Sequence, residues 1–137
     1  MADTFQLQVA TPERLFVDEQ VTEAQVPGKN GYMGILVGHA PLLSALKPGV
    51  LTYSGGSGGQ HALVIDGGFV EVFDNHVRVL ADHAEAAQDV DANKARQQLD
   101  EATRKLHDAR DTAESQAGLR SMEQAQARLD LAQAPNA

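Results

Sequence analysis

Residues 67–95 read GGFVEVFDNHVRVLADHAEAAQDVDANKA, and within them the chain changes from a strand pattern to a helix pattern. The segments 68–73 and 76–81 alternate apolar and polar residues, as strands with one buried face do. Between them stand Asp74 and Asn75, which tolerate the positive φ of a tight hairpin turn. After this hairpin the stretch becomes rich in Ala, Gln and Asp, which favours helix. It therefore predicts a β domain that passes into a helical one.

The residues before this stretch favour strands and turns. Eleven of the twelve glycines and four of the five prolines lie before residue 85. Strand-like runs occur at 5–9, 21–26, 50–54 and 60–66. The GGSGG between the last two runs leads into a strand and not into a helix, so we interpret it as a hairpin connection rather than a phosphate-binding loop. Short strands at this spacing predict a mainly β sandwich or flattened barrel over residues 1–86.

The residues after this stretch predict an antiparallel helical hairpin over 87–137. Asp89 or Asp91 can cap the first helix, because a short side-chain oxygen accepts from the free amides of the opening turn. Its apolar positions alternate at spacings of three and four: Ala92, Ala95, Leu99, Ala102, Leu106, Ala109 and Ala113. After a turn within 108–118, the second run is Leu119, Met122, Ala125, Leu129 and Ala132. Most of these residues are alanines, so the seam is thin, and both a static hairpin and a detachable one that acts as a switch stay open.

The composition excludes several classes of function. The net charge is −8 and the pI is about 4.9, so the chain lacks the basic surface of nucleic-acid or anionic-membrane binders. Aromatic residues make up only 4%, which argues against a base-stacking platform. Cysteine is absent, so disulfides and thiolate metal sites are excluded. We see neither a signal peptide nor an apolar run near the roughly 20 residues of a membrane span, and expect a soluble protein of a cytoplasm-like compartment.

His39 lies in the apolar stretch MGILVGHAPLLSALKPG, residues 33–49. A catalytic general base needs an orienting carboxylate, and the nearest acids in the sequence are Glu23 and Asp66. A small sandwich enzyme that uses His39 is therefore the weaker alternative, and we expect a histidine that hydrogen-bonds a loop backbone. The five histidines are too widely separated for a typical metal site. We expect neither catalytic residues nor a bound metal.

Three blocks of the sequence resemble the epsilon subunit of bacterial F-type ATP synthases. They are VATPERLFVDEQV (9–21), VPGKNGYMGILVGHAPLLSALKPGVL (26–51) and the stretch 67–95 quoted above. The resemblance implies a β-sandwich of about ten strands followed by a two-helix hairpin. It implies a non-catalytic rotor subunit in the central stalk of a proton-translocating ATP synthase, peripheral to the cytoplasmic face of the bacterial inner membrane. It further implies that the sandwich couples the c-subunit ring to the gamma subunit, and that the helices can extend along gamma and inhibit ATP hydrolysis.

The resemblance also assigns partners to particular residues. The segment that matches the c-ring-facing loop comprises Lys29, Asn30, Gly31, Tyr32 and Met33. The segment that matches the gamma-facing side comprises His39, Ala40, Pro41, Leu42 and Leu43. Because Pro41 and Pro48 restrict the backbone around the two leucines, we expect Leu42 and Leu43 to matter at least as much as His39. In the extended state an acidic segment of the catalytic beta subunits, beside alpha, would meet the basic helix residues Arg104, Lys105, Arg110, Arg120 and Arg128.

Some members of this family bind ATP through an Ile/Leu-Asp-x-x-Arg-Ala motif in the first helix and arginines in the second. Here the motif reads Val90-Asp91-Ala92-Asn93-Lys94-Ala95, and the second-helix positions are Gln124 and Arg128. Asp91 and Ala95 are kept, whereas Lys94 stands where the arginine would be. An ammonium cannot reproduce the planar fork of a guanidinium. We therefore expect weak or absent ATP binding and no cofactor, and a nucleotide-sensing sandwich and helix module is the alternative function.

Overall fold

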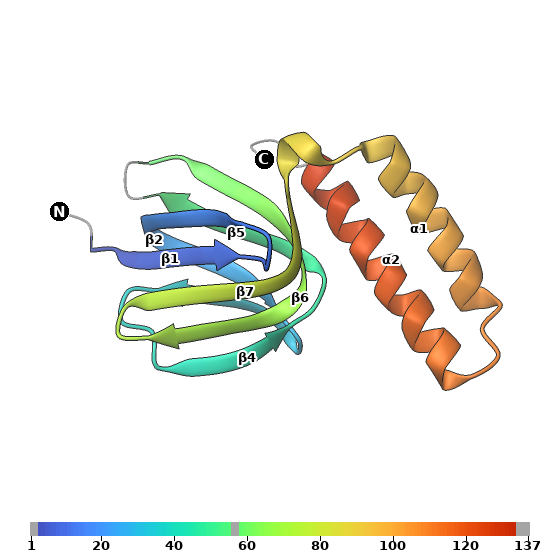
Figure 1. The fold of residues 1–137 in the computed structure, drawn as a ribbon, viewed down its shortest axis with the longest axis horizontal. Helices are drawn as coiled ribbons and strands as arrows, with labels where there is room; N and C mark the ends of the chain where they lie inside the picture. Colours follow the sequence, from blue (N-terminus) through green and yellow to red (C-terminus); the bar gives the residue numbers. More distant parts are fainter. Residues whose placement is uncertain (1–2, 56–57, 134–137) are drawn as a thin grey trace.

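A computed structural model describes residues 3–55 and 58–133. In this part of the chain seven strands come first and two helices last (Figure 1). The strands are β1 (Phe5–Ala10), β2 (Leu15–Gly28), β3 (Gly31–Leu36), β4 (Leu42–Leu46), β5 (Gly49–Gly55), β6 (Gln60–Phe73) and β7 (His76–Ala86). A short 3₁₀ turn, η1 (Ala87–Asp89), leads to α1 (Ala92–His107) and α2 (Thr112–Gln133). The predicted β-sandwich followed by a helical hairpin is confirmed, and neither described helix is long and apolar enough to cross a membrane.

Seven strands suffice for two layers because the long strands take part in both. β2 pairs with β1 through its first half and with β3 and β5 through its second half. β6 pairs with β5 through its first half, with β4 through its second half, and with β7 along most of its length. The number of continuous strands among the described residues therefore differs from the ten expected, since β2 and β6 are each 14 residues long.

Gly67 and Gly68 let β6 bend between its two pairings. The sequence pattern separates 60–66 from 68–73, whereas the structure joins them through these two glycines, whose φ angles are 73° and 108°. A Cβ on Gly68 would lie 2.1 Å from the carbonyl oxygen of Leu80 on β7. Since no side chain fits there, β7 can follow β6 through the bend only with glycine at this position.

The β6–β7 hairpin and the core form as the alternation predicts. Asp74 and Asn75 have φ angles of 46° and 56°, the left-handed conformation of a type I′ turn. β1 then pairs in parallel with β7 and antiparallel with β2. The core is filled by alternate residues of each strand, and its fully buried members include Phe5, Leu7, Val9, Val21, Val26, Ile35, Leu51, Ile65, Val70 and Val77. The same alternation sends the intervening residues to the outer faces.

The two helices pair closely through small residues. Asp91 caps α1, because its Oδ1 accepts from the backbone amide of Lys94 at 3.1 Å; Asp89 lies in η1 instead. A Cβ on Gly118 of α2 would lie 3.1 Å from the Cα of Leu106 in α1, so a glycine permits the close approach. The buried residues along the seam include Ala95, Ala102, Ala125 and Leu129. The predicted thin, Ala-rich seam is present.

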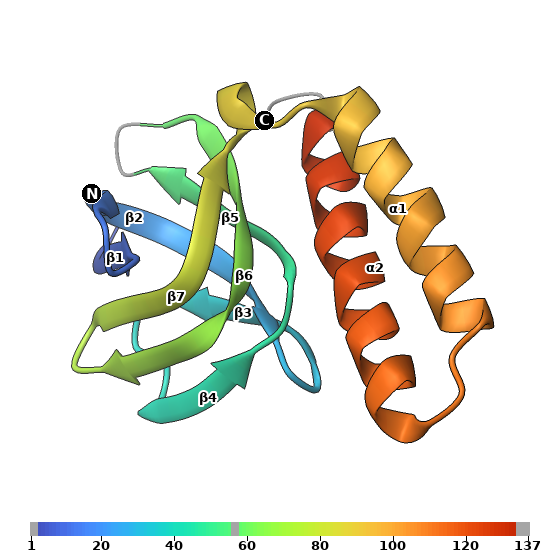
Figure 2. The same cartoon turned by 45° about the vertical axis from the view of Figure 1, so that its right-hand side comes forward.

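α2 also packs on the sandwich, which the single-seam prediction missed. Figure 2 shows α2 between α1 and the strands, and it contacts β5 and β6. Ala127 and Leu131 are buried on this side, whereas the expected seam residue Leu119 is 46% exposed. Ala113 belongs to α2 and not to the first helix, because α1 ends at His107. A helix that buries two faces has no single apolar stripe, so periodicity alone misassigns its residues.

Candidate functional site

His39 bonds to backbone carbonyls beside the β6–β7 turn. Its Nδ1 lies 2.8 Å from the carbonyl oxygen of Ala40, and its backbone amide donates to the carbonyl of Leu36 at 3.1 Å. The preceding Gly38 amide donates to Oδ1 of Asn75 at 2.8 Å, which ties the loop to the β6–β7 turn. These contacts are those of a histidine that orders a loop, and they leave the ring without the carboxylate that a general base needs.

The two leucines of the predicted gamma-facing segment point in opposite directions. Both lie in β4, where successive side chains alternate between the faces of the sheet. Leu42 packs against the core between the layers, whereas Leu43 is 70% exposed. Of the two leucines, Leu43 therefore offers the larger surface to a partner, and Leu42 is only partly accessible.

A row of apolar side chains crosses the outer face of the same sheet. Its members are direct register partners on five strands, in the order Ala45, Phe69, Leu80, Ala10 and Leu15. Phe69, Leu80 and Leu15 are each more than half exposed, at 56%, 54% and 54%. Together with Leu43, two positions from Ala45 on β4, we call these residues the apolar row. Large contiguous apolar surfaces on soluble proteins mark interaction sites.

The apolar row contains residues that the sequence did not single out. Phe69 and Leu80 stand at the outward-facing positions of strands that alternate buried and exposed residues. Their exposure could therefore have been predicted from the sequence pattern. Leu15 could not, because it shares the phase of the buried Val17. A β-bulge shifts the register between Val9 and Ala10, and such an irregularity turns a side chain to the other face. Beside the row, Glu71 and Arg78 form an ion pair at 3.6 Å.

The predicted c-ring segment forms the tip of the β2–β3 hairpin. Lys29 and Asn30 are exposed in the turn, and Tyr32 is 49% exposed while its hydroxyl accepts from the backbone amide of Val50 at 3.0 Å. Met33 packs against the core. The tip and the His39 loop lie at the two ends of β3, six residues apart in extended chain, about 20 Å. The tip and the His39 loop are therefore separate parts of the sandwich surface.

The basic helix residues divide into two sets. Arg104, Lys105 and Arg110 are exposed around the connection between the helices, and Lys105 forms an i,i+4 ion pair with Glu101 at 3.6 Å. Arg120 and Arg128 instead contact carboxylates of the sandwich. In the docked hairpin the five basic residues predicted to meet beta therefore do not form one surface.

The sandwich holds α2 through two carboxylates. Asp66 of β6 accepts from Nε2 of Gln124, with N–O distances of 3.0 and 2.9 Å to its two oxygens, and from Arg120 at 3.3 Å. Glu85 of β7 accepts from Nε of Arg128 at 2.5 Å. Arg128 also donates to the backbone carbonyl of Gln124 at 3.3 Å. Gln124 and Arg128, the second-helix positions of the nucleotide motif, are thus both hydrogen-bonded to carboxylates of the sandwich.

The remaining motif residues do not complete a nucleotide site. The groove that Gln124 and Arg128 line between the helices has a volume of about 190 Å³, below the roughly 300–1,000 Å³ of ordinary ligand pockets. Asp91 caps α1, Lys94 is exposed and Ala95 is buried; none of the three lines the groove. The residues present therefore do not fit ATP, which disfavours the nucleotide-sensing alternative.

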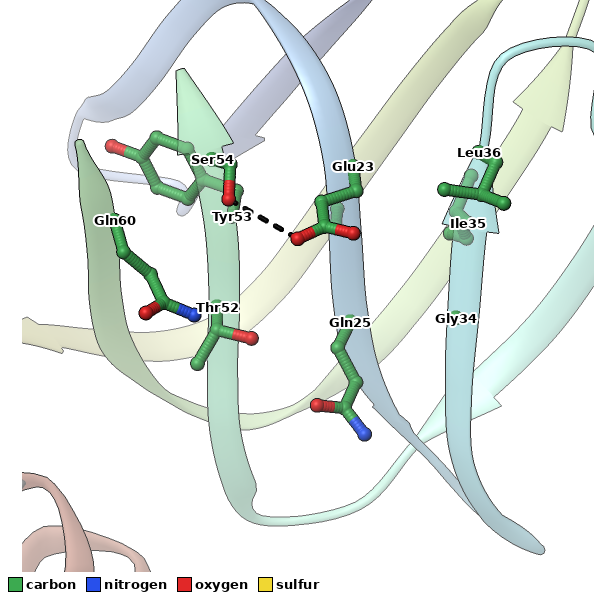
Figure 3. A pocket seen from close by; sticks show the side chains of 10 residues that line it. Glu23, Gln25, Gly34, Ile35, Leu36, Thr52, Tyr53, Ser54 and Gln60 are labelled. Carbon is green, nitrogen blue, oxygen red and sulfur yellow. Dashed lines mark hydrogen bonds between the residues drawn. The ribbon is translucent and has the colours of Figure 1, made fainter. Parts of the chain in front are cut away.

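A hollow of about 350 Å³ lies on the outer face of β2, β3 and β5. Figure 3 shows Glu23 and Ser54 side by side on the neighbouring strands β2 and β5, and Ser54 Oγ donates to the Glu23 carboxylate at 3.2 Å. Gly34 leaves open space at one side. Tyr53 also lines the hollow; burial raises the pKa of its phenol, with a smaller contribution from the charge of Glu19, so it stays protonated at neutral pH. A hydroxyl and a carboxylate without a histidine or oxyanion donors do not form a nucleophilic site.

Residues 3–55 and 58–133 contain no group of three or more histidine, aspartate or glutamate side chains placed to hold a metal ion. The features that remain as candidates are surfaces: the apolar row, the β2–β3 tip and the docked hairpin. Surfaces of this kind serve binding to other proteins.

Comparison with known sequences adds the family. The family described as "ATP synthase, Delta/Epsilon chain, beta-sandwich domain" matches residues 4–87. An ATP synthase epsilon chain of Solibacter usitatus is 53% identical over 104 residues, which cover 76% of this chain and 77% of the relative. Another, from Anaeromyxobacter sp. (strain K), is 41% identical over 127 residues, which cover 92% and 96%.

Comparison with solved structures agrees with the fold. A chain of the Euglena gracilis mitochondrial ATP synthase (OSCP/F1/c-ring) superposes with a TM-score of 0.79 at 26% identity, covering 90% of this chain and 78% of that one. A chain of the Tetrahymena thermophila mitochondrial ATP synthase (central stalk and c-ring) gives a TM-score of 0.71 at 15% identity, covering 93% and 95%. At that identity the second match bears on the fold alone.

Proposed function

The chain belongs to the family of ATP synthase epsilon chains, and we propose a coupling function for it. Epsilon chains are subunits of the central stalk and not the catalytic subunits. In our proposal, the sandwich couples rotation of the c ring to the gamma subunit. Gamma binds the outer face that carries the apolar row, the c ring contacts the β2–β3 tip, and the hairpin inhibits ATP hydrolysis when it extends. The subunit is held only through the complex, peripherally at the cytoplasmic face of the bacterial inner membrane.

The apolar row carries the gamma assignment. It is continuous with Leu43, which the family resemblance places on the gamma-facing side, and it exposes Phe69 and Leu80 across neighbouring strands. Burying several exposed large apolar side chains supplies most of the free energy of a protein interface, concentrated in a few aromatic and aliphatic anchors. The Glu71–Arg78 ion pair beside the row suits the polar rim of such an interface.

Substituting both Phe69→Thr and Leu80→Thr should weaken binding to gamma at least about tenfold, because anchor residues contribute 1–3 kcal/mol each. The side chains are exposed and threonine keeps β-propensity, so the sandwich should still fold. Co-elution with gamma and titration calorimetry measure the effect.

Leu36→Thr is the matched control, since this leucine is 61% exposed on β3 and belongs neither to the apolar row nor to the hairpin; the affinity of this variant for gamma should not change. Among single variants, Leu43→Ala should weaken binding more than His39→Ala. The assignment would be contradicted if the double variant bound gamma with unchanged affinity, or if His39→Ala weakened binding more than Leu43→Ala. Either result would point to the His39 loop as the gamma contact.

The β2–β3 tip supports the c-ring assignment. Its exposed turn is held by the Tyr32 hydroxyl and by a hydrogen bond from the Lys29 amide to the carbonyl of Ala45 at 2.9 Å. Because the chain contains no cysteine, Asn30→Cys places a single thiol at the tip. In the assembled ATP synthase, a bifunctional cross-linker should join it to the c subunit, whereas Gln116→Cys on α2 should not reach it. A cross-link to gamma alone from Asn30→Cys would contradict the assignment.

The hairpin carries the inhibitory function. The hairpin contacts the sandwich over a small area, which suits an element that undocks reversibly. Arg104, Lys105 and Arg110 stay exposed in the docked state. Extension would add Arg120 and Arg128 to a basic surface that complements an acidic segment of beta. The rate of ATP hydrolysis with and without the hairpin measures this function.

A further inference from the structure

α2 meets the sandwich through a small apolar contact and a pair of charged ones. The buried apolar residues are Val64 of β6 with Ala127 and Leu131 of α2. Only partly buried side chains surround them: Val50, Ala62, Ala87 and Val90. Val64 and Leu131 are the two larger fully buried side chains and Ala127 is small, so the apolar contact is confined to a few residues. The polar contacts are therefore a second source of the docking free energy.

We propose that Asp66 and Glu85 form a latch that holds the hairpin on the sandwich and takes the place of a bound nucleotide. The latch comprises these two carboxylates and their partners on α2, which are Arg120, Gln124 and Arg128. Its role in regulation rests on the proposed inhibitory function; the docking itself is a property of the isolated chain.

The Asp66 half of the latch fixes one turn of α2. Both carboxylate oxygens lie within 3.0 Å of the Gln124 amide nitrogen, and Arg120, one turn earlier, adds an ion pair at 3.3 Å. The Asp66 side chain is only 14% exposed. A carboxylate removed from water to this extent needs such partners, since an unpaired one is costly. In the docked state Gln124 and Arg120 replace the water that would otherwise solvate Asp66.

The Glu85 half fixes the next turn. Glu85 and Arg128 are 21% and 19% exposed, so water screens their interaction less than at an open surface. Arg128 is also anchored to the carbonyl of Gln124, which presents its guanidinium to Glu85 in a fixed direction. His83, within 3.6 Å of Glu85, is the further titratable group at this carboxylate. Charge-assisted hydrogen bonds of this kind are about twice as strong as neutral ones.

The latch opposes binding of a nucleotide at the motif positions of α2. A triphosphate on α2 would need Gln124 and Arg128, and would stand beside the negative charges of Asp66, Glu85 and Glu101, the last of which lines the same groove. Like charges at this range oppose binding. The docked state of this chain is accordingly set by its own carboxylates rather than by ATP.

The test uses the full isolated chain with the substitutions Asp66→Asn and Glu85→Gln together. Hydrogen exchange of the α2 amides, residues 112–133, reports opening, because a helical hairpin without tertiary contacts is marginal in water. We expect exchange at least about tenfold faster than in the unsubstituted chain, equivalent to about 1.4 kcal/mol. Exchange of the β1 amides should be unchanged.

Glu71→Gln is the matched control, since it removes one carboxylate from an exposed ion pair on the sandwich and should not accelerate α2. Glu85→Arg and Arg128→Glu should each accelerate exchange, and the two together should recover most of the protection.

Exchange of the double variant no faster than that of Glu71→Gln, or no recovery in the charge swap, would overturn the latch. Either result concerns docking in the isolated chain and leaves the binding of gamma to the apolar row untouched. Failure of the latch and failure of the proposed stalk function are therefore distinguishable.

Discussion

At the scale of single residues, the sequence alone did not give the direction in which each side chain points. The segment 39–43 was singled out as a binding surface, yet only Leu43 of its two leucines is exposed, because neighbours in a strand face opposite sides. A β-bulge places Leu15 on the outer face with the apolar row, and the local sequence pattern does not predict this bulge. Such details depend on pairing between strands far apart in the sequence.

Gly68 gives a residue-scale prediction on stability. Gly68→Ala should lower the free energy of unfolding by about 2–4 kcal/mol, because the residue has positive φ and its Cβ would meet the backbone of Leu80. Gly34→Ala is the control, since a Cβ there meets open space and the residue is not in the left-handed region. Urea denaturation of both variants compares them. Equal stability of the two would contradict the account of the β6 bend.

At the scale of elements, features that depend on neighbouring residues were predicted well. Features that depend on packing against two different partners were predicted poorly. The Asp74–Asn75 turn and the cap of α1 depend on neighbouring residues; the turn was predicted, and Asp91 was one of the two caps considered. The strand β6 appeared as two segments because glycines interrupt its alternation. α2 buries residues toward α1 and toward the sandwich, so its periodicity did not reveal Ala127 and Leu131. The sandwich carboxylates that meet α2 were likewise invisible, since 58 residues separate Asp66 from Gln124.

The helical hairpin gives an element-scale prediction on ligand binding. Titration calorimetry of the isolated chain with Mg-free ATP should show no submicromolar affinity, because Gln124 and Arg128 are held by Asp66 and Glu85 and the groove is small. Lys94→Arg is an informative companion, since it restores the motif residue without freeing α2. It should not create tight binding. A clear submicromolar signal from the unsubstituted chain would contradict this interpretation of the helices.

At the scale of the whole molecule, a rigid sandwich carries a weakly attached helical arm. The sandwich has its own core, to which the helices contribute no fully buried residue. The arm rests on a separate small cluster and on the charged contacts at Asp66 and Glu85. To move such an arm from almost always docked to almost always extended takes a difference of about 5.5 kcal/mol. New contacts with gamma and beta are the natural source of that difference.

Removal of the arm tests the central claim most directly. A chain that ends after residue 87 keeps the apolar row and the β2–β3 tip, so it should still co-elute with gamma and assemble into the ATP synthase. The measurement is the rate of ATP hydrolysis by the assembled complex with the full chain and with the shortened one. We predict a several-fold rise on removal of the hairpin. An unchanged rate in a fully assembled complex would contradict the claim that the hairpin inhibits hydrolysis.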